Sequence, residues 1–354
     1  KALSAEAGVR GKVVTGDVTH HIGVAVSRLE QQVYMKNNQL NTVKGLNYLT
    51  QNTNWGTSDA TSWESPLNNK QVLTGVSFTD RIVTKDEAWQ FVLGARYQNV
   101  RSTNYSKKET TYTDHAVSPA VAVVHKFNNK VSMYANYMEG LKSGVIAPDK
   151  TKNVGELMAP VKTKQLEVGA KVDLGKVAAT LSAFEVRNPS YTTDSATNEY
   201  ALNSEVRARG LELNVFGEPV KGTRVLGGFM LLDSKYTKDS SSDALAGKTV
   251  AGTPRVNAML GLEQDITSVK GLSVSTRLNY TGPAYANDAN TIKLGGYTTW
   301  DLGARYTWNT GNAPMTFRAD VYNVLNKNYW NALDRNGIIL GKGRTFMLSL
   351  TANL

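Results

Sequence analysis

The feature that most constrains this chain is a strict alternation of apolar and polar residues, sustained over stretches of about ten residues. One such stretch spans residues 299–308, and the same period of two recurs at 89–98, 165–174 and 345–354. The apolar side of the first stretch would carry Trp300, Leu302, Ala304, Tyr306 and Trp308, and its polar side Thr299, Asp301, Gly303, Arg305 and Thr307. This period is that of a β-strand with one apolar and one polar face. The sequence therefore predicts an all-β fold.

The length of these stretches separates two kinds of β-protein. Strands of a soluble sandwich usually have about five or six residues, whereas strands that cross a membrane need about ten. Aromatic residues near both ends of the apolar faces, such as Trp89 and Tyr97, are typical of interfacial girdles. Charges on the polar faces suit a water-filled lumen and would be costly in a packed core. We therefore expect a transmembrane antiparallel β-barrel of the outer-membrane type.

Composition excludes several classes of protein. No proline-rich linker or charge block divides the 354 residues, so we expect one domain over residues 1–354. No run approaches the roughly 20 apolar residues of a spanning helix. Cysteine is absent, which excludes thiol catalysis and thiolate metal sites. The net charge of +10 favours an anion-attracting surface or lumen, and because Lys and Arg are scattered we expect no nucleic-acid partner.

Two kinds of polar segment alternate strictly between the predicted strands. Short turns are expected near 15–18, 84–87, 127–130, 173–176, 218–223, 267–271 and 309–313. Longer segments are expected near 37–69, 105–113, 143–162, 189–203, 239–253, 286–295 and 329–341. Short periplasmic turns and long outer loops are typical of outer-membrane barrels, and the count gives about fifteen strands. Because bacterial single-chain barrels have an even number of strands, we expect further strands to precede Lys1.

Several motifs in a fixed order carry a resemblance to a known family. They are SAEAGVRG at 4–11, SPAVAVVH at 118–125, SMYANYMEGLK at 132–142, KQLEVGAK at 164–171, RARGLEL at 207–213, WDLGARY at 300–306, DVYNVLNKNYW at 320–330 and GKGRTFMLSLTANL at 341–354. Together they resemble the C-terminal part of TonB-dependent siderophore receptors. The resemblance implies about 15 strands of a 22-stranded barrel. The plug domain, the TonB box and the opening strands have no counterpart in this sequence.

The same resemblance implies a function and partners. Receptors of this kind take up ferric siderophores through the bacterial outer membrane with energy relayed by TonB. The expected partners are a ferric siderophore, outer-membrane lipids, and the TonB complex, which would be contacted through the missing N-terminal region. Iron would arrive inside its chelator, so we expect no cofactor and no metal site on the protein.

Candidate ligand-binding residues are aromatic side chains on the outer loops and arginines on the polar faces, because a ferric siderophore is often anionic and has apolar or aromatic arms. They are Trp55, Trp63, Tyr191, Tyr200, Tyr285, Tyr329, Trp330, Arg96, Arg305 and Arg318. For the arginines the favoured alternative is an inward ion pair, Arg305 with Asp301 and Arg318 with a neighbouring strand. The aromatic residues could equally pack within girdles or loops.

The Asn-rich stretch 323–330 has no helical period and lies between two alternating segments. In the family that it resembles, this stretch is the top of the penultimate strand, where pairing ends. We expect Asn323 and Asn326 to hydrogen-bond their own backbone as the ladder stops, with Tyr329 and Trp330 at the outer rim. A structural role is favoured over ligand contact.

Nothing in the sequence favours an enzyme, and no catalytic residues are predicted. Of the four histidines, His20 and His21 point to opposite faces of one strand, and only His115 would lie near the outer mouth. A hydrolase would need a base, a carboxylate and a nucleophile together. A passive diffusion porin is the main alternative, since 354 residues would suit a sixteen-stranded barrel. A barrel enzyme with His115 as its base is a third class.

Overall fold

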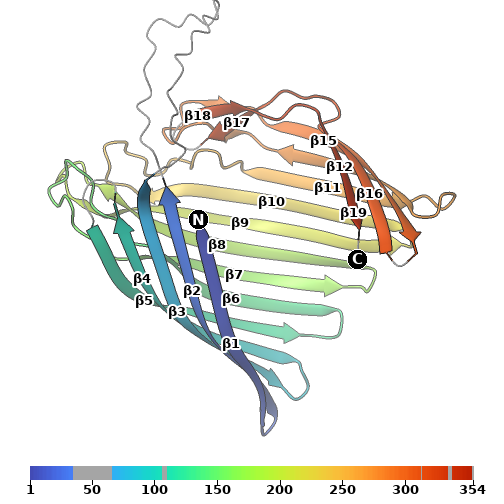
Figure 1. The fold of residues 1–354 in the computed structure, drawn as a ribbon, viewed down its shortest axis with the longest axis horizontal. Coiled ribbons are helices and arrows are strands. Elements are labelled where there is room, and N and C mark those ends of the chain that lie inside the picture. Colours follow the sequence, from blue (N-terminus) through green and yellow to red (C-terminus); the bar gives the residue numbers. More distant parts are fainter. Residues whose placement is uncertain (35–65, 106–109, 312, 334–336, 353–354) are drawn as a thin grey trace, which may run out of the picture. The chain divides into compact units, whose positions relative to one another are not determined.

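The computed structural model of the chain describes residues 1–34, 66–105, 110–311, 313–333 and 337–352 (Figure 1). All of the regular secondary structure in these ranges consists of β-strands, as the alternation predicts. Among the described residues, no helix is long and apolar enough to cross a membrane.

Fifteen strands form one sheet in the order β1-β2-β3-β4-β5-β6-β7-β8-β9-β10-β11-β12-β15-β16-β19, so nearly every strand pairs with its neighbours in sequence. Their bounds are β1 Ala2–Thr15, β2 Val18–Tyr34, β3 Leu67–Thr84, β4 Trp89–Asn104, β5 Thr110–Lys126, β6 Val131–Lys142, β7 Val161–Asp173, β8 Val177–Thr193, β9 Tyr200–Val220, β10 Thr223–Lys238, β11 Val256–Asp265, β12 Leu272–Thr281, β15 Tyr297–Thr310, β16 Ala313–Tyr322 and β19 Thr345–Ala352. The predicted strand count is confirmed. Two small hairpins lie in the loops, β13 Ala284–Tyr285 with β14 Lys293–Leu294, and β17 Trp330–Leu333 with β18 Gly337–Leu340.

The chain divides into two compact units. One comprises Lys1–Val9, Gly23–Phe78 and Arg96–Val117, and the other comprises Arg10–Ile22, Thr79–Ala95 and Ser118–Leu354. All of β6 to β19 therefore belongs to the second unit, in which each successive pair of sheet strands is antiparallel.

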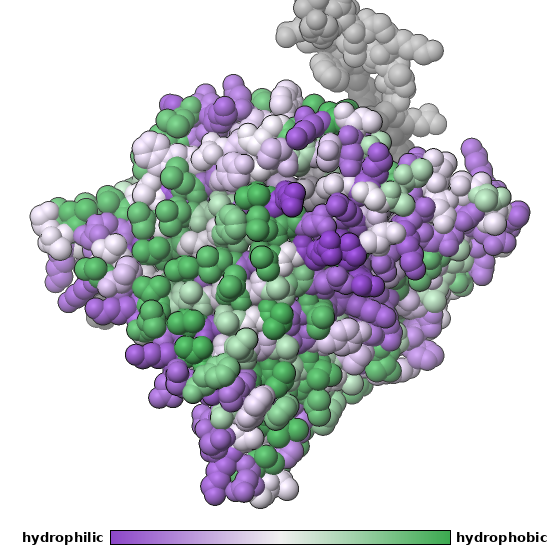
Figure 2. All heavy atoms as spheres, turned by 180° about the vertical axis from the view of Figure 1, so that it is seen from behind, coloured by the Kyte–Doolittle hydropathy of each residue, from purple (hydrophilic) through white to green (hydrophobic). Residues whose placement is uncertain are grey.

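Within the second unit the register gives the sheet two chemically different faces. Leu213 lies opposite Phe229 on one face, which we call the lipid face. The other, which we call the lumen face, carries charged residues such as Glu263 and Asp301. Large apolar side chains of the lipid face remain exposed, Leu166 by 58%. Figure 2 shows hydrophobic side chains spread over a broad area of the molecular surface, as a membrane-facing wall requires.

The loops agree with the predicted alternation of short and long connections, with two corrections. β5 begins at Thr110, inside the predicted loop 105–113. The segment 189–203 was expected to be a long loop, but β8 continues to Thr193 and β9 begins at Tyr200. Pro189 and Ser190 remain opposite Glu205 and Ser204, because cross-strand pairing continues where the apolar alternation has stopped. Only 194–199 forms the connection. We call the end of the sheet with the longer connections the outer end and the other the turn end.

Candidate functional site

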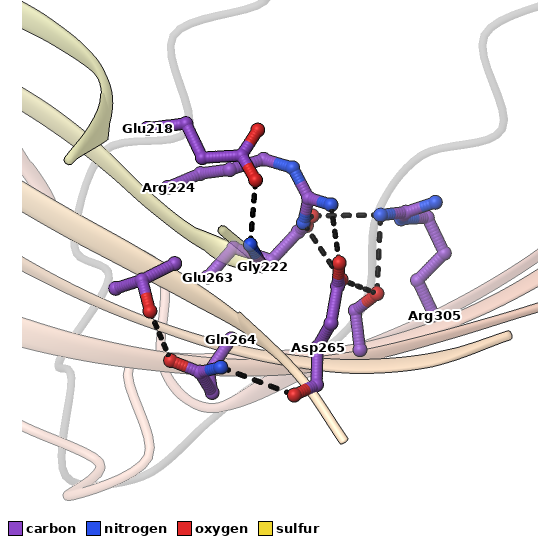
Figure 3. A network of polar contacts seen from close by, with 9 residues as sticks. Glu218, Gly222, Arg224, Glu263, Gln264, Asp265 and Arg305 are labelled. Carbon is purple, nitrogen blue, oxygen red and sulfur yellow. Dashed lines mark hydrogen bonds and ion pairs between the residues drawn. The ribbon is translucent and has the colours of Figure 1, made fainter. Parts of the chain in front are cut away.

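A cluster of two arginines and two carboxylates lies on the lumen face at the turn end (Figure 3). Arg224 donates to Glu263 at 2.6 Å and to both oxygens of Asp265 at 2.9 and 2.7 Å. Arg305 approaches from β15 and donates to the same Glu263 oxygen at 2.7 Å and to Ser273 at 3.2 Å. We call these five residues the Glu263 cluster. Each arginine has a carboxylate within hydrogen-bond distance.

The turn between β9 and β10 sets the position of this cluster. Gly222 has φ +82°, a conformation that favours glycine, and its N–H donates to Glu218. The turn starts β10 at Thr223, which places Arg224 directly opposite Glu263 on β11. A local backbone feature thus fixes which charges meet across the strands.

A second cluster, the Asp301 cluster, lies farther toward the outer end. Asp301 is only 8% exposed and accepts hydrogen bonds from Arg277 at 3.0 and 3.1 Å and from Asn279 at 2.9 Å. Its other oxygen accepts the backbone N–H of Asn323 at 2.8 Å. The Arg277 guanidinium also lies over the Tyr322 ring, 5.9 Å from its centroid. One carboxylate therefore joins two strands to the start of the last outer connection.

A cavity of about 320 Å³ on the lumen face is lined by residues of both clusters together with Arg318, Asp320 and Tyr322. Arg318 is exposed and makes no ion pair with any residue in the described part of the chain, so the predicted pair with a neighbouring strand is not found. The prediction that Arg305 pairs with Asp301 is also wrong. Arg305 and Asp301 lie on the same strand, but Arg305 donates to Glu263 on β11, and Asp301 accepts from Arg277, which lies directly opposite it on β12.

The Asn-rich stretch is organised as predicted at Asn323, whereas the Asn326 side chain bonds backbone 18 residues away. Asn323 and Asn326 adopt positive φ values of 51° and 49°. The Asn323 side chain accepts from the backbone N–H of Lys327 and donates to the carbonyls of Lys327 and Lys342, and Asn326 accepts from the N–H of Arg344. Both amides thus replace β-ladder hydrogen bonds where β16 ends.

Tyr329, at the end of this stretch, packs against the wall instead of projecting freely. Its ring stacks on Tyr297 with centroids 3.9 Å apart. Its close packing also requires glycine at 341, where a Cβ would meet the Tyr329 ring. Burial raises the pKa of the Tyr329 hydroxyl. Trp330, the next residue, is 51% exposed on β17.

The other aromatic candidates are also at the outer end. Tyr191 and Tyr200 stack with centroids 5.8 Å apart, and Tyr191 donates to the Ala159 carbonyl at 3.1 Å. Tyr285 lies in β13, and its carbonyl accepts from Gly252 at 2.8 Å. The structure thus brings the two candidates Tyr191 and Tyr200 together. It pairs Tyr329 with Tyr297, a residue that was not among the sequence candidates.

Three candidates remain. Arg96, in the first unit, donates to the hydroxyl of Ser27 at 2.7 Å, and no ion pair joins it to another described residue. Trp55 and Trp63 lie outside the described residues.

Sequence reasoning missed Arg224, Glu263, Asp265 and Arg277 as a group. Alternation places them on polar faces, but which of them meet depends on register.

The histidines form no catalytic or metal-binding set. His20 pairs with Asp80 at 2.7 Å, and the His115 ring packs at a tilt against Tyr97 with centroids 5.7 Å apart. His125 packs between Trp89 and Phe127. In the part of the chain that the structure describes, no group of three His, Asp or Glu side chains could hold a metal ion.

Comparison with known families gives one clear match. The model of the family described as TonB dependent receptor-like, beta-barrel matches residues 5–324. The chain is 32% identical over 365 aligned residues to the ferrichrome receptor FcuA of Yersinia enterocolitica, covering 98% of this chain and 47% of that protein. It is 26% identical to the ferrichrome outer membrane transporter/phage receptor of Escherichia coli K12, covering 92% of this chain and 45% of that protein.

Solved structures give the same result. The crystal structure of BauA, the ferric preacinetobactin receptor from Acinetobacter baumannii, is 36% identical and superposes with a TM-score of 0.84, covering 99% of this chain and 54% of BauA. The ferric-catecholate import receptor Fiu of Escherichia coli shares the fold at 16% identity with a TM-score of 0.75. The chain spans about half the length of the curated relatives that it matches.

Proposed function

Because this chain belongs to the TonB-dependent receptor family and lies in the outer membrane, we propose that its protein takes up ferric siderophores with energy relayed by TonB. The observation that carries the proposal is the 32% identity to a ferrichrome receptor over 98% of the chain. BauA, a receptor for a ferric preacinetobactin, supports the same class of cargo. A passive porin would not account for this similarity.

The geometry supports two kinds of ligand contact along the lumen face, aromatic contacts at the outer end and charged groups below them. Aromatic side chains gather at the outer end, where Trp330 is exposed and the Tyr191–Tyr200 and Tyr297–Tyr329 pairs stack. Such faces suit the apolar or aromatic arms of a siderophore. Charged groups line the wall below, as a water-filled path for a polar chelate requires. Iron is cargo, and the chain supplies no covalent chemistry.

Uptake of ⁵⁵Fe-loaded siderophores tests the proposal. The complete gene product is expressed in a strain that lacks its own siderophore receptors, with and without TonB, and offered hydroxamate, catecholate and mixed-ligand ferric siderophores. We expect saturable uptake of at least one chelate, lost when TonB is deleted. Uptake that rises linearly with concentration and does not need TonB would favour the porin.

A substitution at the outer end tests the binding site. Trp330→Ala should raise the half-saturating chelate concentration about three- to tenfold, because an aromatic contact contributes about 0.5–1.5 kcal/mol. Trp308→Ala, near the turn end of β15, is the matched control and should leave that concentration unchanged. If both substitutions raise the half-saturating concentration equally, Trp330 is not part of the binding site.

A further inference from the structure

The outer connections of the second unit contact one another in the order of the sequence. They join β6 to β7, β8 to β9, β10 to β11, β12 to β15 and β16 to β19, and their described residues are 143–160, 194–199, 239–255, 282–296, and 323–333 with 337–344. We call this series the outer collar. Loops are usually the most mobile part of a fold, whereas these connections are held together by specific hydrogen bonds.

Each connection in the collar is bonded to the next one, or to the residue directly after it. One hydrogen bond from each joint shows the series: Lys152 N–H to the Asn198 carbonyl at 2.9 Å, Ser195 N–H to the Ser240 carbonyl at 2.8 Å, Gly252 N–H to the Tyr285 carbonyl at 2.8 Å, and the Tyr297 hydroxyl to the Asn331 side chain at 3.0 Å. These contacts join segments from five different places in the chain.

Two of the joints are reinforced by an asparagine whose side chain imitates a β-ladder partner. Asn153 donates to the Tyr200 carbonyl and accepts from the Tyr200 N–H, both at 2.9 Å. Asn290 does the same with Thr249, at 2.7 and 2.8 Å. An amide can do this because it carries a donor and an acceptor side by side. Each asparagine therefore fixes the backbone of one residue outside its own connection.

The Asn153 side chain is itself held in one orientation. Its Nδ2 also donates to the Glu156 carboxylate at 2.8 Å, which fixes the end of the amide that faces the Tyr200 carbonyl. The neighbouring backbone is fixed as well, because Lys152 is bonded to Asn198, two residues before Tyr200. The start of β9 is thus attached to the 143–160 connection at two adjacent points.

Tyr200, the residue that Asn153 holds, is one of the candidate ligand contacts. Its ring stacks on Tyr191 with centroids 5.8 Å apart and 25° between the ring planes. Tyr191 is held by the same connection, since its hydroxyl donates to the Ala159 carbonyl at 3.1 Å. Ordering a side chain during binding costs free energy, and two rings that are already fixed avoid most of this cost.

We propose that Asn153 is a positioning residue for chelate binding, which holds Tyr200, and thereby its stack with Tyr191, in the binding orientation before a ferric chelate arrives. The inference rests on the proposed function and adds the residue that prepares the aromatic contact. Asn153 acts through Tyr200 instead of touching the chelate, because its amide is already bonded to Tyr200 and Glu156. Aromatic groups stack on such a pair, so the gain is confined to chelates with aromatic arms.

Uptake of ⁵⁵Fe-loaded siderophores by the full-length receptor tests this, with a catecholate and an aliphatic hydroxamate as the two probes. Asn153→Ala should raise the half-saturating concentration of the catecholate about three- to tenfold, because the stack must then be ordered on binding. The maximal uptake rate per receptor and the half-saturating concentration of the hydroxamate should not change. A variant that only folded poorly would instead lower the maximal rate for both probes.

Asn290→Ala is the matched control, because it removes the same two backbone hydrogen bonds at a joint that includes neither Tyr191 nor Tyr200. It should leave the half-saturating concentration of the catecholate unchanged. Equal rises in the two variants, or no rise in Asn153→Ala, overturn the inference. If the wild type takes up the hydroxamate but not the catecholate, this inference alone fails. Non-saturable uptake of both probes without TonB overturns the proposed function, and the inference with it.

Hydrogen exchange of the receptor without chelate tests the joint independently of transport. In Asn153→Ala the Tyr200 amide loses its acceptor and should exchange about tenfold faster or more, while the Thr249 amide should exchange as in the wild type. Unchanged exchange at Tyr200 overturns the inference.

Tyr191→Phe covers the case in which Asn153→Ala does not fold. This variant keeps the ring but loses the hydrogen bond to the Ala159 carbonyl. The half-saturating concentration of the catecholate should rise about twofold or more, because the ring is present but no longer anchored. A wild-type value in this variant overturns the inference, since the fixed orientation of the stack would then not matter.

Discussion

The lumen-face clusters and a row of four cations on the lipid face use the same kind of residue on the same kind of strand, with opposite results. The row, which we call the cationic row, consists of Lys164, Arg187, Arg207 and Lys235, each opposite the next across neighbouring strands. In the Glu263 cluster a carboxylate lies between Arg224 and Arg305, and in the Asp301 cluster a carboxylate pairs with Arg277. In the cationic row, Arg207 lies between Arg187 and Lys235. The directly opposite residue does not by itself decide the outcome. Arg305 lies opposite Ser273 and Arg318 yet reaches Glu263 two strands away, whereas Arg207 lies between two cations and forms no ion pair with another described residue.

The largest effect should come from removing the centre of a lumen-face cluster. Asp301→Ala leaves the Arg277 guanidinium without its carboxylate and the backbone N–H of Asn323 without an acceptor. We expect a loss of about 2–4 kcal/mol in the free energy of unfolding, because both groups keep their desolvation cost. Denaturant unfolding of the full-length receptor in detergent, followed by its heat-dependent mobility on gels, measures the loss.

Asp320→Ala is the matched control for that experiment. Asp320 lies on the same face and makes no ion pair with another described residue. Its removal should change the free energy of unfolding little. If Asp301→Ala and Asp320→Ala lower the free energy of unfolding equally, the Asp301 cluster does not stabilise the sheet. The contrast with the cationic row would then have no energetic basis.

A smaller loss is expected when one lumen-face charge is removed without changing its shape. Glu263→Gln weakens the contacts of Arg224 and Arg305, but Arg224 keeps Asp265 and Arg305 keeps Ser273. The free energy of unfolding should fall by about 1–2 kcal/mol. Glu87→Gln removes a carboxylate from a solvent-exposed pair with Lys126 at 3.5 Å and should have no measurable effect. A matching fall in the control would contradict the prediction.

The fold could be predicted from the sequence because its signal is local. Alternation over 299–308 and 345–354 gives strand, face and approximate length without any knowledge of neighbours. The bond between the Asn323 side chain and the backbone N–H of Lys327 is predictable for the same reason, whereas Asn326 accepts from the N–H of Arg344, 18 residues away, which a local pattern does not reveal. From Pro189 to Thr193, β8 remains paired with β9 although the apolar–polar alternation has ended. The local sequence pattern does not predict a strand there.

The candidate site was less predictable because it depends on register. Arg305 was assigned to Asp301 on its own strand, whereas its partner Glu263 is 42 residues away in sequence. The Tyr297–Tyr329 stack joins residues on either side of two strands and a turn. The cationic row is invisible in the sequence for the same reason, since its members come from four separate strands.

The smallest predicted effect has the opposite sign and depends on salt. In neutral detergent at low salt, Arg207→Gln should raise the free energy of unfolding by about 0.2–1 kcal/mol, because it removes repulsion from the two flanking cations. At 1 M salt the Debye length is about 3 Å, so the gain should vanish. Arg209→Gln is the control, since Arg209 lies opposite Asp233 and its removal should not stabilise. Stabilisation by Arg207→Gln that persists at high salt would mean that packing, not charge, governs the row.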